Sequence, residues 1–258
     1  MAKVRKPSTY SSANNSPTTH ALIGPLRVER CRWGFLVACL IASLAALSTG
    51  ETRAAENDRP GAFDYYVLVL TWAPSYCLGE GHRRKDAQCG TKRPHAFTLH
   101  GLWPQYEEGW PLNCPTGRRP WVPQRVIDEM VDIMPSKGLI IHEYRTHGTC
   151  SGLDPAEYFA VARELYEQVR VPERFASAET GTLSPEEIER AFGDANAWLK
   201  PDMMSVTCRS GRLLDLRICF GRDLFPRNCG VNEDQKRLCP AAKITIPRWR
   251  LRVKCGVG

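Results

Sequence analysis

The chain has 258 residues, of which 43% are hydrophobic and 24% are charged, and its formal net charge is +7 at pH 7. These proportions are typical of a globular protein and exclude a disordered, collagen-like or coiled-coil chain. The longest apolar run, Trp33 to Leu47, has 15 residues. A membrane-spanning helix needs roughly 18 to 20, so the run argues against a membrane transporter.

The N-terminal segment has the order of a secretory signal. Arginines precede the apolar run, and small residues follow it near Thr52–Ala55. Basic, apolar and small residues in that order are typical of a signal peptide that is removed on export. We therefore expect residues 1–55 to be a signal peptide and leader, residues 56–258 to form a single domain, and the protein to be periplasmic or secreted. The run Leu36–Cys39 is similar to a lipoprotein cleavage box, an alternative that the short apolar stretch before it disfavours.

Most of the positive charge lies in that leader. Residues 1–55 hold seven basic and two acidic residues, which leaves 28 basic and 26 acidic residues in the domain. So small an excess does not support a protein that wraps duplex DNA through many phosphate contacts. We expect no DNA binding, and no membrane binding once the leader is removed, so any nucleic-acid chemistry comes from a local site.

The domain is predicted to begin with a buried strand over residues 63–72. Its sequence, FDYYVLVLTW, is dense in aromatic and β-branched residues and stops before Pro74. The segment from Thr98 to Trp103 then leads into a loop, rich in proline and glycine, that runs to Pro120. Apolar residues recur at helical spacing between Pro123 and Pro135, which predicts a short amphipathic helix.

Two later helices are marked by their first residues. Asp154–Glu157 and Ser184–Glu187 each place a capping side chain, then proline, then glutamate three residues after the cap. These signals predict helices over about 155–170 and about 185–193.

The last third of the chain is strand-like. Alternating apolar residues predict strands over 213–220 and 243–253. Helices in the middle and strands at both ends predict an α+β fold with a central, mostly antiparallel sheet and helices packed on it.

The cysteines also indicate export. Nine remain after residue 55, and an oxidising compartment would pair most of them. Their spacing lacks the close pairs of a zinc ribbon, so we predict four disulfides and one odd thiol. The nine are Cys77, Cys89, Cys114, Cys150, Cys208, Cys219, Cys229, Cys239 and Cys255.

Three histidines lie in two short segments, FTLHGLWP with His100 and HEYRTHGTC with His142 and His147. Histidine is the side chain whose unperturbed pKa lets it give or take a proton near neutral pH. Two histidines brought together can therefore act as acid and base in one reaction.

The second segment resembles the zinc motif HExxH, but its spacing differs. His142 and His147 are five residues apart, which separates them by about 140° on an α-helix, whereas the zinc motif needs a spacing of four. We therefore expect no metal and no other cofactor. Glu143 and His147 are four apart and share a helix face, so we predict that Glu143 favours the charged form of His147.

The strings FTLHGLWP and HEYRTHGTC, 47 residues apart between His100 and His147, resemble the two active-site motifs of the ribonuclease T2 family. FDYYVLVLTWAPSYC and Ile218–Phe220 extend the resemblance over about residues 62–247. It implies the disulfide-bonded α+β fold of that family. It also implies a metal-independent endoribonuclease that cleaves single-stranded RNA through a 2′,3′-cyclic phosphate to a 3′-phosphate end. We expect the protein to be a monomer.

The resemblance assigns roles by position. His147 would take a proton from the ribose 2′-hydroxyl and His100 would protonate the leaving 5′-oxygen, although the sequence leaves open which histidine is base and which is acid. Glu143 would stabilise the charge at phosphorus or hold a histidine, and His142 would bind phosphate. Base binding is expected at Trp103, Trp110 and Gln105. The implied disulfides are Cys77–Cys89, Cys114–Cys150, Cys208–Cys239 and Cys219–Cys229, with Cys255 left over.

One position departs from the family pattern. The family usually has lysine directly before the catalytic histidine of the second motif, where this chain has Thr146. Losing a group that stabilises the transition state typically costs about 10²- to 10³-fold in rate. We expect an active enzyme with altered rate or pH behaviour, in which Arg145 is the candidate substitute. The alternative is a catalytically weak homologue that binds RNA or a partner.

Overall fold

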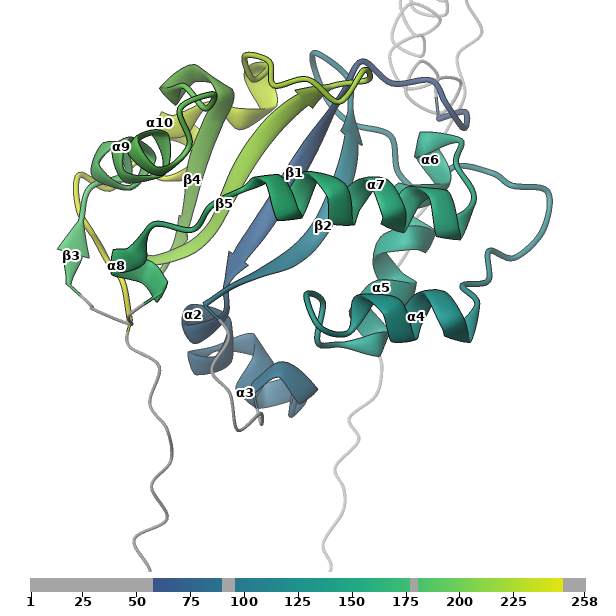
Figure 1. Cartoon of the computed structure of the whole chain (residues 1–258), viewed down its shortest axis with the longest axis horizontal. Helices are drawn as coiled ribbons and strands as arrows, with labels where there is room; N and C mark the ends of the chain where they lie inside the picture. Colours follow the sequence, from purple (N-terminus) through teal and green to yellow (C-terminus); the bar gives the residue numbers. More distant parts are fainter. Residues whose placement is uncertain (1–57, 90–95, 177–180, 248–258) are drawn as a thin grey trace, which may run out of the picture. The chain divides into compact units, whose positions relative to one another are not determined.

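The computed structural model describes residues 58–89, 96–176 and 181–247 (Figure 1). The predicted signal peptide and leader, Cys255 and the end of the strand predicted over 243–253 lie outside these residues. No helix within the described ranges is long and apolar enough to span a membrane.

A six-stranded sheet forms the centre of the fold, in the order β2-β1-β5-β6-β3, with β4 also paired to β5. The pairs are antiparallel except for a short parallel contact between β5 and β6. The predicted α+β fold with a mostly antiparallel sheet is confirmed. The strands are β1 (Tyr65–Trp72), β2 (Phe97–Gln105), β3 (Thr182–Leu183), β4 (Met204–Arg209), β5 (Arg212–Gly221) and β6 (Ile244–Thr245).

The helices begin largely where the sequence predicts. Asp154 and Ser184 both form complete capping boxes, at the starts of α7 and α9. The helix predicted between Pro123 and Pro135 is α4, which is shorter than those bounds. The α-helices are α2 (Ala73–Leu78), α3 (Glu80–Arg84), α4 (Gln124–Met130), α5 (Lys137–Glu143), α6 (Thr149–Ser151), α7 (Pro155–Gln168), α8 (Glu173–Ala176), α9 (Pro185–Ala195) and α10 (Gln235–Leu238). A π-helical turn, η2 (Tyr144–Gly148), follows α5, and the 3₁₀ turns are η1 (Ala87–Cys89), η3 (Pro201–Met203) and η4 (Val231–Glu233).

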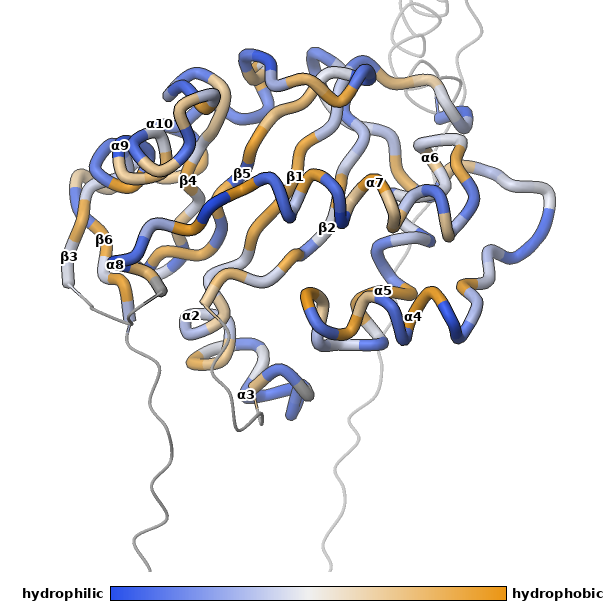
Figure 2. Tube along the Cα trace, viewed as in Figure 1, coloured by the Kyte–Doolittle hydropathy of each residue, from blue (hydrophilic) through white to orange (hydrophobic). Residues whose placement is uncertain are grey.

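The main core lies between the sheet and the helices. Side chains of β1, β2 and β5 pack there against α4, α5, α7 and α9, and α7 runs across the strands in Figure 1. Figure 2 shows the matching hydrophobic segments along the central strands. Because side chains alternate along a strand, the same strands send a second set of side chains to the opposite face. Val67 and Val69 of β1 lie there with Cys219 of β5.

Four disulfides fasten the elements: Cys77–Cys89, Cys114–Cys150, Cys208–Cys239 and Cys219–Cys229. These are the pairs that the resemblance implies. The Cys114–Cys150 bridge ties the loop after β2 to α6, which contains the last residues of the second histidine segment. The bridge therefore joins the loop that follows the first histidine motif to the end of the second motif.

Candidate active site

His100 lies at an irregularity in the sheet. In the β1–β2 register Val69 pairs with Gly101 and Leu70 pairs with Leu99, so His100 is an extra residue in β2. A bulge of this kind re-aims side chains. It lets Leu99 keep its place in the main core while the His100 side chain stays 34% exposed.

The second motif spans the end of α5, the π-helical turn η2 and the start of α6. Single π turns are frequent at functional sites. Glu143, the last residue of α5, is buried beneath β2, where its Oε2 accepts a 2.8 Å hydrogen bond from Trp103 Nε1. Its other oxygen, Oε1, lies 3.6 Å from His100 Nε2.

Trp103 joins the two histidine segments. The His147 ring stacks on it with centroids 5.0 Å apart, and the His100 ring meets it nearly edge-on at 5.4 Å. Glu143 is hydrogen-bonded to the same indole. The structure thus brings together His100, Glu143 and His147, the predicted catalytic residues, around one aromatic ring.

His142 and Thr146 lie at the exposed edge of this cluster. Thr146 Oγ1 is 3.5 Å from His142 Nδ1, and the His142 side chain is exposed. Arg145 is turned to the loop after β2, where its Nε donates to the Pro120 carbonyl at 3.1 Å. Its role as a substitute for the missing lysine therefore has no support from this geometry.

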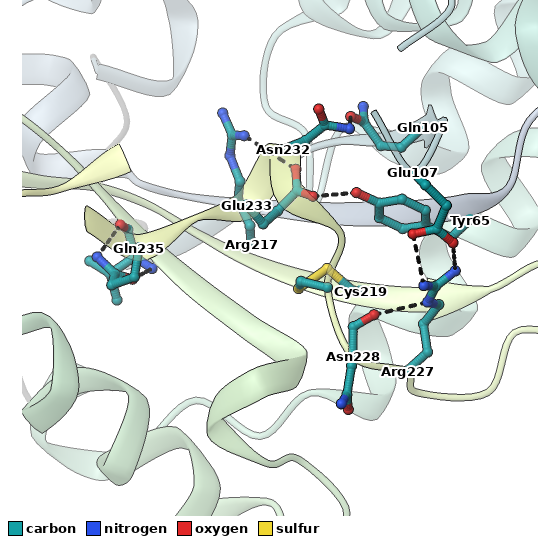
Figure 3. The surroundings of a disulfide bond; sticks show 12 residues. Tyr65, Gln105, Glu107, Arg217, Cys219, Arg227, Asn228, Asn232, Glu233 and Gln235 are labelled. Carbon is teal, nitrogen blue, oxygen red and sulfur yellow. Dashed lines mark hydrogen bonds and ion pairs between the residues drawn. A yellow bond between two sulfur atoms is a disulfide. The ribbon is translucent and has the colours of Figure 1, made fainter. Parts of the chain in front are cut away.

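The three residues expected to bind a base occupy different environments. Trp110 is 52% exposed. Gln105 is buried, and its Oε1 accepts a 3.2 Å hydrogen bond from Asn232, so its carbonyl oxygen is engaged within the protein (Figure 3). The Trp103 ring contacts His147, and the Arg217 guanidinium lies over it at 5.1 Å.

A sequence model of the ribonuclease T2 family matches residues 63–229. The chain belongs to the ribonuclease T2 family. It is 37% identical to a ribonuclease of Aeromonas hydrophila over 184 residues, and this alignment covers 70% of this chain and 82% of that protein. It is 27% identical over 240 residues to ribonuclease I of Escherichia coli strain K12, covering 76% of this chain and 89% of that protein.

Solved structures share the T2 fold. The RNase-related protein from Calystegia sepium superposes with a TM-score of 0.57 at 24% identity, over 72% of this chain and 97% of that one. Trichomaglin, an S-like ribonuclease, gives 0.58 at 23% identity, over 73% and 100%. The family resemblance seen in the sequence is confirmed, and the protein is a T2-family ribonuclease.

The two histidines of this ribonuclease have opposite pKa shifts. Burial lowers the pKa of His147 to about 3, and the nearby charges of His100 and His142 act in the same direction. Burial also acts to lower the pKa of His100, but Asp215 and Glu143 outweigh it and the net pKa is raised. Near neutral pH the His147 ring is therefore neutral, whereas the shift at His100 favours its protonated form.

The prediction that Glu143 favours the charged form of His147 is wrong, because the charges that act on the pKa of His147 are those of His100 and His142, and both lower it. That prediction assumed one α-helix through both residues. The helix ends at Glu143, a π-helical turn follows, and the Glu143 carboxylate faces Trp103 and His100 instead.

The raised pKa of Glu143 predicts that the stability of the fold depends on pH. Burial raises its pKa from 4.5 to about 7, against the opposing effects of His100 and Trp103. Between these values the folded protein holds a proton that the unfolded chain releases, so the free energy of unfolding falls as pH rises. In Glu143→Gln we expect this fall in the free energy of unfolding to be smaller by up to about 3 kcal/mol.

Urea denaturation at about pH 5 and about pH 8 measures that difference. Glu164→Gln, which changes an exposed acid of α7, is the control and should behave as the wild type. Identical pH dependence in Glu143→Gln and wild type would contradict the prediction.

Two residues next to His100 were missed by the sequence analysis. Thr71 Oγ1 lies 3.1 Å from His100 Nδ1, and Asp215 Oδ1 lies 3.9 Å from the same nitrogen. Neither belongs to a histidine motif. The pairing of β1 with β2 brings Thr71 beside His100, and the pairing of β1 with β5 brings Asp215 beside Thr71. Among the described residues, no group of three or more His, Cys, Asp or Glu side chains is placed to hold a metal ion.

Proposed function

We propose that this T2-family ribonuclease cleaves single-stranded RNA without a metal, by transphosphorylation to a 2′,3′-cyclic phosphate and then hydrolysis to a 3′-phosphate. The observation that carries the proposal is the pair of histidines with opposite pKa shifts against one Trp103 ring. A reaction whose nucleophile is part of the substrate needs the protein only to move protons and to stabilise charge.

In the first step, neutral His147 takes the proton of the 2′-hydroxyl as its oxygen bonds to phosphorus. Protonated His100 gives its proton to the 5′-oxygen as the phosphorus–oxygen bond breaks. In the second step the roles reverse. His100 takes a proton from water as the water oxygen bonds to phosphorus, and His147 gives its proton to the 2′-oxygen as the bond between that oxygen and phosphorus breaks, which leaves a 3′-phosphate. When ionised, Glu143, whose Oε1 lies 3.6 Å from His100 Nε2, stabilises the charged imidazolium, and its hydrogen bond from Trp103 holds the carboxylate beside that ring.

Substrate binding is proposed at the rim of this cluster. The exposed His142 binds phosphate, and the half-exposed Trp110 stacks on a base. Stacking of this kind is worth about 1 to 3 kcal/mol per base and tolerates any sequence. Trp103 and Gln105, whose contacts lie within the protein, shape the site from beneath the substrate.

Export to the periplasm or the exterior is part of the proposal. It is supported by the signal-like order of residues 1–55 and by the four disulfides, which persist in oxidising compartments. We propose that residues 56–258 form one catalytic domain that acts as a monomer.

The test is incubation of the purified protein with single-stranded RNA, with and without a chelator. We expect products ending in cyclic phosphate in both samples. A His100→Ala/His147→Ala double variant purified in the same way controls for contaminating nucleases. Binding without products would favour the catalytically weak homologue, and cleavage lost with the chelator would favour a metal-dependent hydrolase.

Thr146 predicts a gain of function. Thr146→Lys would place a cation one residue from His147, where negative charge develops in the transition state, so we expect kcat to rise about 10-fold or more. Arg145→Ala should change kcat much less, because Arg145 is bound to the Pro120 carbonyl. Single-turnover cleavage of one RNA by both variants measures this. An unchanged rate for Thr146→Lys would show that a cation at this position is not limiting.

A further inference from the structure

Asp215 of β5 is a buried carboxylate beneath the site. It pairs with Thr71 of β1 in the sheet register, and its side chain is only 7% exposed. Its Oδ1 accepts a 2.6 Å hydrogen bond from Thr71 Oγ1, and its Oδ2 accepts one of 3.0 Å from Thr207 Oγ1. Both carboxylate oxygens are therefore held by hydroxyl groups of neighbouring strands. A carboxylate fixed in this way is rigid and stays charged, since hydrogen bonds to the charged form favour it.

The Thr71 hydroxyl links this carboxylate to His100. A hydroxyl has one proton, and the shorter contact, 2.6 Å to Asp215 Oδ1, takes it. Towards His100 Nδ1, at 3.1 Å, the Thr71 oxygen can therefore only accept. It follows that His100 Nδ1 carries a hydrogen and is directed into the sheet. The other ring nitrogen, Nε2, lies 3.6 Å from Glu143 Oε1, which is beyond hydrogen-bond distance, so its proton is not bound to that carboxylate.

Charged and titratable groups face His100 from three elements. Asp215 and Arg217 lie on β5, Glu143 ends α5, and His147 lies in η2. Asp215 and Glu143 favour the imidazolium, whereas Arg217 opposes it. The carboxylates are on opposite sides of the ring, because Asp215 is near Nδ1 and Glu143 is near Nε2.

We propose that Asp215 and Thr71 are positioning residues for the general acid: they hold His100 with Nδ1–H inward and Nε2 towards the leaving 5′-oxygen. This inference rests on the proposed function, and it assigns to two residues outside both histidine motifs a part in the departure of the leaving group. The bond between the 2′-oxygen and phosphorus forms while the bond to the 5′-oxygen breaks, and the Nε2 proton passes to that oxygen. Asp215 stays ionised throughout, and Thr71 keeps its hydroxyl proton.

A leaving group that needs no proton separates this role from a structural one. We compare a dinucleoside monophosphate with the 4-nitrophenyl ester of the same nucleoside 3′-phosphate, which releases a stable phenolate. For Asp215→Asn we expect kcat/KM to fall about 10-fold or more on the dinucleotide, within the range of general acid catalysis. The ester should lose much less. The alkaline limb of the pH profile should move to lower pH, since His100 loses a stabilising charge.

Thr71→Val should reproduce the loss on the dinucleotide, and Thr71→Ser, which keeps the hydroxyl, should restore it. Glu189→Gln, a change of a buried acid on α9 that the proposal does not use, should match the wild type.

NMR titration of the His100 ring in wild type and Asp215→Asn gives a readout that does not depend on turnover, and the pKa of His100 should be lower in the variant. Equal losses on both substrates, or an unchanged His100 titration, would overturn the positioning role while wild-type cleavage still supports the ribonuclease. No cleavage by the wild type would overturn the proposed function itself, whatever the titration shows.

Discussion

Replacement of His147 or His100 by alanine is expected to lower kcat/KM for a dinucleotide by about 10²- to 10⁴-fold, the range that a general acid or base supplies. Neither side chain has a substitute of the same kind, because the third histidine of the site, His142, lies at its exposed edge. The two losses should differ in their dependence on the leaving group. His147→Ala removes the base and should impair the dinucleotide and the 4-nitrophenyl ester alike. His100→Ala removes the acid and should impair the dinucleotide far more.

His82→Ala is the matched control, because His82 is an exposed histidine of α3 outside the site. It should leave both rates unchanged. Circular dichroism and thermal unfolding verify that each variant is folded before rates are compared. A His100→Ala variant that loses the same factor on both substrates would assign the acid to another group. A His147→Ala variant with near-normal rates would remove the base from the mechanism.

Local signals in the sequence predicted the elements whose boundaries depend on few residues. The capping boxes at Asp154 and Ser184 fixed the starts of α7 and α9. The run of β-branched and aromatic residues at 65–72 forms a strand buried along its whole length. The strand β4 (Met204–Arg209) was not predicted, because it has six residues and its place depends on pairing with β5.

The histidine motifs predicted the chemistry of the site but not its electrostatics. His100 and Glu143 come together because β2 has a bulge and α5 ends in a π-helical turn. Both are departures from regular geometry, so sequence patterns with the period of a regular helix or strand, 3.6 or 2 residues, do not predict them. The sequence argument paired Glu143 with His147 on a regular helix face, whereas the folded chain directs Glu143 to His100.

Asp215 and Thr71 show a second limit. They are 144 positions apart and meet only because β1 and β5 pair in register. Leu216 and Ile218 of β5 face the main core, and because side chains alternate along a strand, the neighbouring Asp215 lies on the opposite face. The pattern does not say that a histidine of another strand lies beside it. Its place could be found only from the sheet topology.

Gly101→Ala is expected to lower kcat/KM about 100-fold, since displacing a catalytic group by about 1 Å can cost that much. A Cβ built on Gly101 would lie 2.0 Å from Glu143 Oε2 and 2.8 Å from Trp103 Nε1. The hydrogen bond between these two atoms would have to break or move, and both are held by burial against β2. The change should also destabilise the fold by about 1 to 3 kcal/mol, as overpacking of a filled site does.

Gly138→Ala is the control, because Gly138 is an exposed glycine of α5, the helix that ends at Glu143, and its added Cβ meets nothing closer than 4.0 Å. It should keep full activity and gain up to about 1 kcal/mol of stability from helix propensity. The clash itself is tested by a double-mutant cycle with Glu143→Asp, whose shorter side chain withdraws the carboxylate. Glu143→Asp should reduce activity when it is the only change. In the Gly101→Ala background it should cause little further loss or restore activity. Additive losses would mean that Gly101→Ala acts by changing the backbone of β2 and not by a clash between the new Cβ and the Glu143 carboxylate.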